Sequence, residues 1–435
     1  MTPAKYAFAA LLGLLLHAAA PGLAAEEEYG FSPDEFEKKT LVWGGYVEAK
    51  GEHADINQDG GFSVLNFYRD PRSTIESLSS TLQLNGSYSR ETTTFNWVVQ
   101  ATGTQDELAW SDKADIFEGY ASIKANPNLS LDLGKKVFKW GKGYAWNPVG
   151  FIDRSKDPNN PEEALEGYMG GGFDLVKSYG GDLHTVALTA VALPAWRGVN
   201  EDFGEQDNVN LAAKLYLLYK DTDIDFLWYT GNSRSTRYGV DFSKNLATNL
   251  EIHGELAHIP RQKYRVLTEA GQLTTREVSD TSYLLGLRYL TENDITTIVE
   301  FYHNDDGYTE QETTQFFQLL DTGYNQFLAT GSDALLQQAT LVSESGYARP
   351  QTGRDYLYAR ITMKDPFDLL YFTPGITAIA NLDDLSYSLS PELTYTGFTN
   401  WEMRLRLSYL NGATYSEYGE KQNSNKVEAR LRYFF

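Results

Sequence analysis

The final ten residues of the chain, 426–435, alternate strictly between apolar and charged side chains. Strand side chains point to opposite faces with period two, so Val427, Ala429 and Leu431 share one face and Lys, Glu and Arg occupy the other. Similar alternation recurs in 93–104, 208–219 and 400–411, in runs of about the length that a tilted strand needs to cross hydrocarbon. Lipid on one face and a hydrated lumen on the other explain this pattern, which predicts a transmembrane antiparallel β-barrel.

The alternation and the intervening turn residues predict 18 strands in an all-β, up-and-down barrel; 16 strands are the alternative, because 172–180, 223–231 and 235–243 alternate least clearly. The predicted strands lie near 40–50, 76–89, 93–104, 115–125, 129–139, 172–180, 183–193, 208–219, 223–231, 235–243, 248–259, 281–290, 294–303, 354–364, 373–382, 385–396, 400–411 and 424–435. Short turns rich in Gly, Pro, Asn and Asp alternate with long loops. The predicted long loops are 51–75, 104–114, 140–171, 194–207, 260–279, 303–353 and 412–423. Short periplasmic turns and long extracellular loops are typical of such barrels.

The N-terminus has the features of a secretory signal peptide. Lys5 is followed by an apolar run and a small-residue zone that ends at Ala25, so we expect 1–25 to be removed, 26–39 to lie in the periplasm and 40–435 to form the barrel. The chain has no cysteine, which excludes disulfides, thiolate metal sites and a covalent c-type haem of its own. A formal charge of −22 argues against nucleic-acid binding.

Three features carry a family resemblance: the Gly-Lys-Lys-Val-Phe-Lys-Trp-Gly-Lys-Gly segment that begins at Gly134, the abrupt corner 381–384, and the terminal Phe435. Together they resemble porin-like outer-membrane proteins of Gram-negative bacteria, with the 18-stranded alginate-export porin and related substrate-specific porins as the nearest comparison. The resemblance implies an outer-membrane location, contact with lipid and lipopolysaccharide, and recognition of Phe435 by the barrel-assembly machinery.

Two sets of residues are candidates for the pore. By strand parity, arginines of the C-terminal strands face the lumen, where guanidinium groups favour anions. These are Arg354, Arg360, Arg404, Arg406, Arg430 and Arg432. Alternatively, they pair with Glu300, Glu392, Glu402 and Glu428 and brace the wall. The second set is Lys135, Lys139, Trp140 and Lys142, at the start of a predicted constriction loop whose cations and aromatic faces suit sugars or aromatic acids. A surface cap is the alternative role of that loop.

The segment Asp55-Ile56-Asn57-Gln58-Asp59-Gly60 matches the start of an oxygen-ligand calcium loop. Position twelve of the loop is Asn66 where the pattern requires Glu, so an Asx-rich turn is the alternative to a Ca²⁺ clip, and we expect no other cofactor. Glu251, His253 and Glu255 share one strand face and are interpreted as charged wall residues. No histidine has the spacing of a hydrolase or zinc motif, so we expect no enzyme.

These observations predict a porin that passes small polar or anionic solutes passively. The alternative is a structural barrel that sheathes or anchors a periplasmic or surface partner, such as a cytochrome conduit or polysaccharide machinery. Paired apolar residues at seven- to eight-residue intervals also predict short amphipathic helices within 303–353, as a lid or as a partner-binding element.

Overall fold

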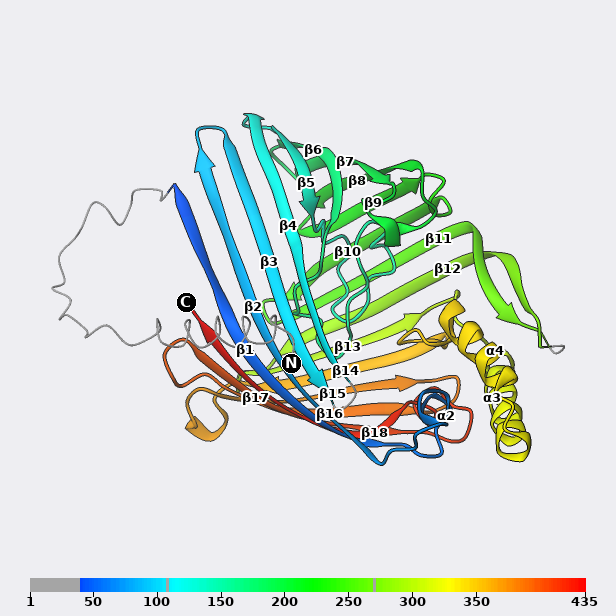
Figure 1. The fold of residues 1–435 in the computed structure, drawn as a ribbon. Helices are drawn as coiled ribbons and strands as arrows, with labels where there is room; N and C mark the ends of the chain where they lie inside the picture. Colours follow the sequence, from blue (N-terminus) through cyan, green and yellow to red (C-terminus); the bar gives the residue numbers. More distant parts are fainter. Residues whose placement is uncertain (1–39, 107–108, 269–270) are drawn as a thin grey trace.

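The computed structural model describes residues 40–106, 109–268 and 271–435, which form a closed barrel of 18 antiparallel strands (Figure 1). The predicted segments 1–25 and 26–39 lie outside the described residues. Strand β1 (Leu41–Ile56) pairs with β2 (Thr74–Arg90) on one side and with β18 (Asn423–Phe434) on the other, with Tyr46 opposite Phe434. This pairing closes the barrel, which has no free edge, and satisfies the strand backbone internally.

All eighteen predicted strands are present, so the alternative of 16 strands is wrong. The others are β3 (Thr93–Asp106), β4 (Trp110–Asn126), β5 (Leu129–Lys136), β6 (Tyr168–Ser178), β7 (Leu183–Ala195), β8 (Asn208–Tyr219), β9 (Thr222–Thr230), β10 (Arg237–Ala247), β11 (Leu250–Leu267), β12 (Leu273–Leu290), β13 (Ile295–His303), β14 (Asp355–Met363), β15 (Phe372–Asn381), β16 (Tyr387–Tyr395) and β17 (Trp401–Asn411).

Two predicted long loops are mostly strand. Residues 260–279 continue β11 and β12 as a hairpin, with Lys263 opposite Glu277, and 104–114 is shortened because β3 and β4 extend into it. Both extensions carry polar residues on both faces, so the ladder continues where the apolar alternation stops. Hydrogen-bonded pairing needs no apolar face once the strands leave the lipid.

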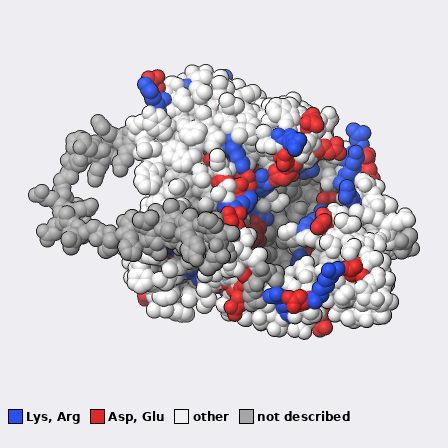
Figure 2. Space-filling view, viewed as in Figure 1, with Lys and Arg blue, Asp and Glu red and all other residues white. Residues whose placement is uncertain are grey.

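The two faces of the wall separate as the alternation predicts. On β18, Val427 and Leu431 are exposed on the outer surface, whereas Glu428 between them is buried inside. Figure 2 shows charged side chains of both signs gathered around a hollow, while the surrounding outer surface is mostly uncharged. The outer surface is therefore suited to lipid and the interior to water and ions.

Helices occupy the outer connections. They are α2 (Gly61–Phe67), α3 (Glu310–Thr330) and α4 (Ala334–Val342), with short helical turns at Glu201–Phe203 and Ser343–Tyr347. A further helical turn, Pro366–Asp368, lies at the other end of the barrel, in the connection between β14 and β15. The predicted helices of 303–353 are thus confirmed; α3 begins with a capping box in which Thr309 and Glu312 bond each other's backbone N–H groups. Phe316, Leu320 and Leu336 pack with α2 into one apolar core. Among the described residues, no helix is long and apolar enough to span a membrane.

Candidate constriction of the lumen

The connection between β5 and β6, residues 137–167, folds into the barrel and binds its inner wall. Glu255 on β11 accepts hydrogen bonds from the backbone N–H of Lys142 (2.5 Å), Gly143 (2.6 Å) and Val149 (3.3 Å). The predicted constriction loop therefore lies in the lumen, and the alternative of an external surface cap does not describe it.

A second wall carboxylate holds the same segment. Glu300 on β13 accepts the N–H groups of Tyr144 (2.5 Å) and Ala145 (2.8 Å), and it lies 2.9 Å from Nε2 of His253 on β11. Both glutamates are buried. The predicted pairing of Glu300 with arginine is wrong, because its oxygens are already occupied by the loop and by His253.

Glycines allow the loop to approach these carboxylates closely. Gly141 has a φ of 100°, and a Cβ there would lie 2.7 Å from the Glu255 carboxylate. At Gly143 a Cβ would meet the carbonyl oxygen of Trp146 at 2.1 Å. Gly141 thus allows the docking of the loop on the wall, and Gly143 allows the tight turn of the loop itself.

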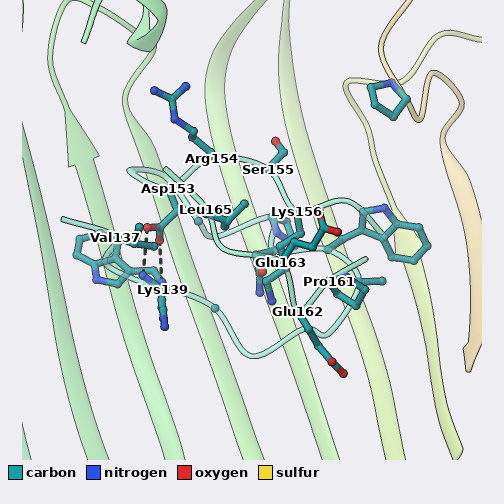
Figure 3. Close-up of a pocket in the computed structure, with 18 of the residues that line it drawn as sticks. Val137, Lys139, Asp153, Arg154, Ser155, Lys156, Pro161, Glu162, Glu163 and Leu165 are labelled. Carbon is teal, nitrogen blue, oxygen red and sulfur yellow. Dashed lines mark hydrogen bonds between the residues drawn. The ribbon is translucent and has the colours of Figure 1, made fainter. Parts of the chain in front are cut away.

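Asp153 orders the start of the loop from within. Its carboxylate accepts the backbone N–H groups of Phe138 (2.9 Å), Lys139 (3.1 Å) and Trp140 (2.8 Å). Figure 3 shows Asp153 bonded to the segment that contains Lys139. Burial raises the pKa of Asp153, and the three hydrogen bonds act in the opposite direction. Trp140 is only 3% exposed and packs with Val149, so it offers little aromatic face to a solute.

The predicted lysines of this loop separate in space. The Nζ of Lys142 lies 2.9 Å from Asp225 and 3.8 Å from Asp241, two buried wall carboxylates, and is pinned there. Lys135 pairs with Glu166 at 2.5 Å. Lys139 is exposed and lines the outer cavity described below. The structure therefore does not bring the predicted cations of this loop together as one site.

The tip of the loop, 159–164, faces a basic wall formed by β1, β14, β17 and β18. Between them lies a cavity of about 530 Å³, which we call the eyelet. Its charged lining consists of Lys50, Arg360, Arg404, Arg406, Arg430 and Arg432 with Glu48, Glu162, Glu163 and Glu402. Five of the six predicted arginines thus meet here. Arg354 does not, because it precedes β14 in the outer connection, where strand parity no longer applies, and donates to the carbonyl of Gly307 (3.1 Å).

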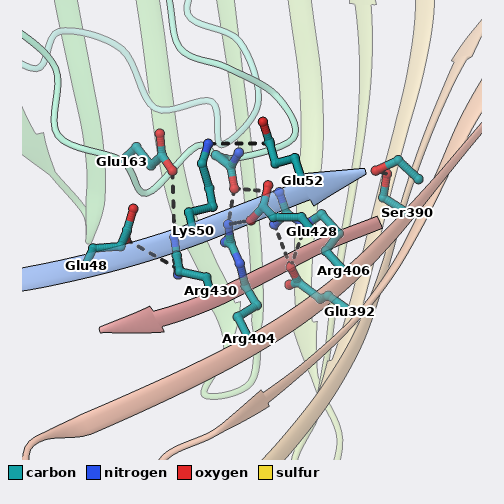
Figure 4. Close-up of polar contacts among 12 residues, drawn as sticks. Glu48, Lys50, Glu52, Glu163, Ser390, Glu392, Arg404, Arg406, Glu428 and Arg430 are labelled. Carbon is teal, nitrogen blue, oxygen red and sulfur yellow. Dashed lines mark hydrogen bonds and ion pairs between the residues drawn. The ribbon is translucent and has the colours of Figure 1, made fainter. Parts of the chain in front are cut away.

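Each eyelet arginine also has a carboxylate partner in the wall. The nitrogen–oxygen distances are 2.6 Å for Arg404–Glu428 and 2.6 Å for Arg406–Glu392 (Figure 4). They are 2.8 Å for Arg430–Glu402, 2.6 Å for Arg432–Glu48 and 3.2 Å for Arg360–Glu392. The arginines therefore both brace the wall and line the lumen.

The loop tip contacts the same arginines. The Asn160 side-chain oxygen accepts from Arg404 (3.1 Å) and Arg406 (2.6 Å). Glu162 lies 3.3 Å from Arg360, and Glu163 lies 3.7 Å from Arg430. Glu48, Lys50 and the loop-tip residues were absent from the predicted site. The parity of the first strand could have indicated the first two, whereas the acids of an irregular loop carry no periodic signal.

An outer cavity of about 840 Å³ adjoins the eyelet. Its lining includes Lys139, Lys156 and Tyr302 from the barrel interior and Arg349 from the outer β13–β14 connection. Residues 161–164 line both cavities and therefore stand between them. The arrangement is a wide outer chamber, a charged loop tip and an inner chamber.

The predicted calcium ligands do not converge. Asp55 is the penultimate residue of β1 and accepts a hydrogen bond from Asn425 (3.4 Å), and Asn57 uses its amide nitrogen to donate to the carbonyl of Gly419 (2.7 Å). Gly61 already begins α2, so the segment with Asp59 is a strand-to-helix turn. Within the described ranges no group of three or more His, Asp or Glu residues has a metal-binding arrangement. Ca²⁺ binding stays a prediction that these contacts do not favour.

Comparison with known proteins identifies the architecture. No protein-family model and no curated protein matches the sequence. Among solved structures, Pseudomonas aeruginosa OccK5 (OpdH) matches with a TM-score of 0.53 and 11% identity, and OccK8 (OprE) with 0.53 and 10%; each match covers 90% of this chain and 98% of that chain. P. aeruginosa OccK2 (OpdF), solved in complex with glucuronate, matches with a TM-score of 0.51 and 12% identity over 90% and 98%. These matched structures are substrate-specific Occ porins rather than alginate-export porins, and at this identity the likeness concerns the fold: the chain is an 18-stranded barrel of the kind these porins have.

Proposed function

We propose that this protein is an outer-membrane porin through which small polar or anionic solutes pass passively between the arginine wall and the loop tip 159–164. The observation that carries the proposal is the eyelet, where five arginines and Lys50 line a lumen cavity opposite a docked loop. The shared fold with Occ porins supports it, and one of them was solved with glucuronate, an anionic sugar. Positive groups in a confined wet channel lower the barrier for anions.

The charges of the eyelet predict a partial preference for anions. Six cations and four carboxylates line the cavity, and the arginine partners Glu392 and Glu428 lie in the wall beside them. Arg404 and Arg406 also donate to Asn160, a neutral acceptor. A solute carboxylate would replace that neutral oxygen by a charged one, which forms a stronger bond with guanidinium.

The location and assembly follow from the same proposal. We infer cleavage of 1–25, insertion into the Gram-negative outer membrane, and recognition of Phe435 by the assembly machinery. Phe435 exchanges backbone hydrogen bonds of 3.1 Å with Gly45, at the seam where the last strand meets the first. Phe435 would therefore be accessible to the assembly machinery until β1 and β18 pair.

The alternative of a barrel that sheathes a partner is less well supported. The chain's own loop crosses the lumen and is tied to Glu255, Glu300 and the arginine wall. A protein inside the barrel would have to replace those contacts. We propose no catalytic role.

Planar-bilayer recordings test the porin proposal. The wild type should conduct ions with a reversal potential that indicates anion preference, and Arg404→Glu with Arg406→Glu should shift it toward cations. Arg354→Glu is the matched control for Arg404→Glu alone, since it makes the same charge change outside the eyelet. Folding is checked by the heat-modifiable migration of the barrel in gels, with Arg404→Gln as a milder variant. Absence of conductance in the folded wild type would refute the channel, and equal selectivity in all variants would refute the arginine wall.

A further inference from the structure

The periplasmic connection between β14 and β15, residues 364–371, has an unusual composition. Phe367 is 90% exposed, and Leu369, Leu370 and Tyr371 are 57%, 61% and 54% exposed. Other turns at this end, such as 220–221 and 291–294, consist of polar residues. Four exposed apolar side chains thus lie within five residues, interrupted only by Asp368, and a cluster of this kind marks a surface that another apolar phase covers.

The connection is ordered, although its backbone is strained. The N–H of Asp365 donates to the carbonyl of Phe372 (2.9 Å), and the N–H of Tyr371 donates to the Asp365 carboxylate (2.5 Å). Neighbouring turns hold it on both sides, through Lys364 N–H to Asp294 (3.2 Å) and Thr396 N–H to Tyr371 (3.0 Å). Four non-glycine residues have left-handed φ values: Asp365 (48°), Phe367 (55°), Asp368 (61°) and Tyr371 (70°). Four such residues in one hydrogen-bonded turn indicate that the turn is held in a conformation that exposes its apolar side chains.

The height of the barrel wall indicates what covers the patch. On β14 the outward apolar residues run only from Leu357 to Met363. Six steps of about 3.3 Å make about 20 Å along the strand. At a tilt of about 40° this gives roughly 15 Å of height, against an apolar band of about 25 Å. The wall is therefore short here, and the apolar turn continues it toward the periplasm.

Aromatic residues connect the outer wall to this rim. Phe372 and Tyr395 lie 4.6 Å apart between ring centroids, and Tyr395 and Phe398 lie 5.5 Å apart. Rings at this level fit the boundary between acyl chains and headgroups, where one side is apolar and the other is wet. The patch is thus continuous with the lipid-facing surface.

We propose that residues 364–371 insert into the interfacial layer of the inner leaflet and anchor the β14–β15 side of the barrel there. The inference rests on the proposed membrane location but not on conduction. Lipid is what covers this turn, because the turn extends the short apolar wall of β14 toward the periplasm and is continuous with the lipid-facing surface.

Site-directed spin labelling tests the anchor cleanly, because the chain has no cysteine. Phe367→Cys and Leu370→Cys of the full chain are labelled with a nitroxide and placed in phosphatidylethanolamine–phosphatidylglycerol vesicles. The measurement is the ratio of label accessibility to oxygen, which concentrates in lipid, over that to a water-soluble nickel chelate. Ile361→Cys on the outer face of β14 is the lipid control, and Asn293→Cys in a polar turn at the same end is the water control.

We expect the ratio at Phe367 and Leu370 to approach that at Ile361 and to exceed that at Asn293 severalfold. Values at both sites equal to that at Asn293, with Ile361 in lipid, would overturn the anchor and leave a periplasmic protein as the cover of this turn. A water-like value at Ile361 would instead contradict the membrane location itself. Gel migration confirms that each labelled barrel is folded.

Discussion

Replacing Glu300 by Gln should loosen the constriction loop in a measurable way. Glu300 is fully buried and accepts the N–H groups of Tyr144 and Ala145 together with His253. A hydrogen bond to a charged acceptor contributes about 1.5–3 kcal/mol, and a buried donor without an acceptor costs about 1–3 kcal/mol. Glutamine keeps one acceptor oxygen and presents an NH₂ group to the other donor. We therefore expect the docking free energy of the loop to fall by about 2–4 kcal/mol.

The weaker docking of the loop in Glu300→Gln should appear as more frequent transitions between conductance levels. Since about 1.4 kcal/mol corresponds to a factor of ten, the ratio of docked to undocked loop should fall roughly thirtyfold to several hundredfold. Glu255 still holds Lys142 and Gly143 in this variant, so the combined Glu255→Gln and Glu300→Gln variant should show a larger effect. The two effects need not add, because both residues hold one segment.

Single-channel recordings measure the fraction of time spent at a higher conductance level. We expect the wild type to occupy that level rarely and Glu300→Gln to visit it often. Asp174→Asn is the matched control: it also converts a lumen-side carboxylate to an amide, but it accepts a hydrogen bond from Thr189 of the wall and from no described residue of the loop. If Glu300→Gln and the double variant gate like Asp174→Asn, the loop is not held by these carboxylates, and our account of the constriction is refuted.

Three further outcomes are expected. Glu162→Gln with Glu163→Gln removes the acids of the loop tip and should increase anion preference in the reversal potential; an unchanged value would show that the tip does not face the conducting path. Hydrogen bonding to Arg69 lowers the pKa of Asp333 from 3.8 to about 2, so this contact of the outer helices should persist above pH 4 and be lost as the pH falls through 2. Pepsin should then cut the wild-type connection 304–354 faster near pH 2 than at pH 3.5, and Asp333→Asn should reduce this difference between the two pH values. Deletion of Phe435 should lower the amount of assembled barrel in outer-membrane fractions, and full assembly would contradict a role in recognition.

The strands were predictable because each carries its own signal. Lipid and water impose period two on every membrane-crossing segment, and turn residues mark one end of each hairpin. The prediction failed where that physical cause ends. Beyond the lipid, β11 and β12 continue to Leu267 and Leu273 with polar side chains on both faces, so hydrogen bonding extends the strands without leaving a pattern in hydrophobicity.

The site was predictable on the wall and not on the loop. Parity placed Arg404 and Arg406 in the lumen, because strand geometry fixes the direction of each side chain. It could not assign Lys142 to Asp225, or Glu255 to the loop backbone, since these partners lie far apart in sequence and meet only after closure. Trp140 illustrates the same limit: a tryptophan suited to stacking is instead buried in the packing of the loop.

Two groups of lumen carboxylates differ in what they bind, and this difference shapes the channel. Those of β11 and β13, Glu255 and Glu300, are occupied by backbone N–H groups of the loop. Those of β16–β18, such as Glu392 and Glu428, are occupied by arginines. One stretch of the wall therefore holds the loop, while the neighbouring stretch keeps its cations ordered and facing the cavity. Because the loop tip brings Glu162 and Glu163 against those cations, charge varies across the eyelet rather than along it. A solute with separated polar and charged groups would meet both signs at once, so orientation as well as net charge should decide which solutes pass.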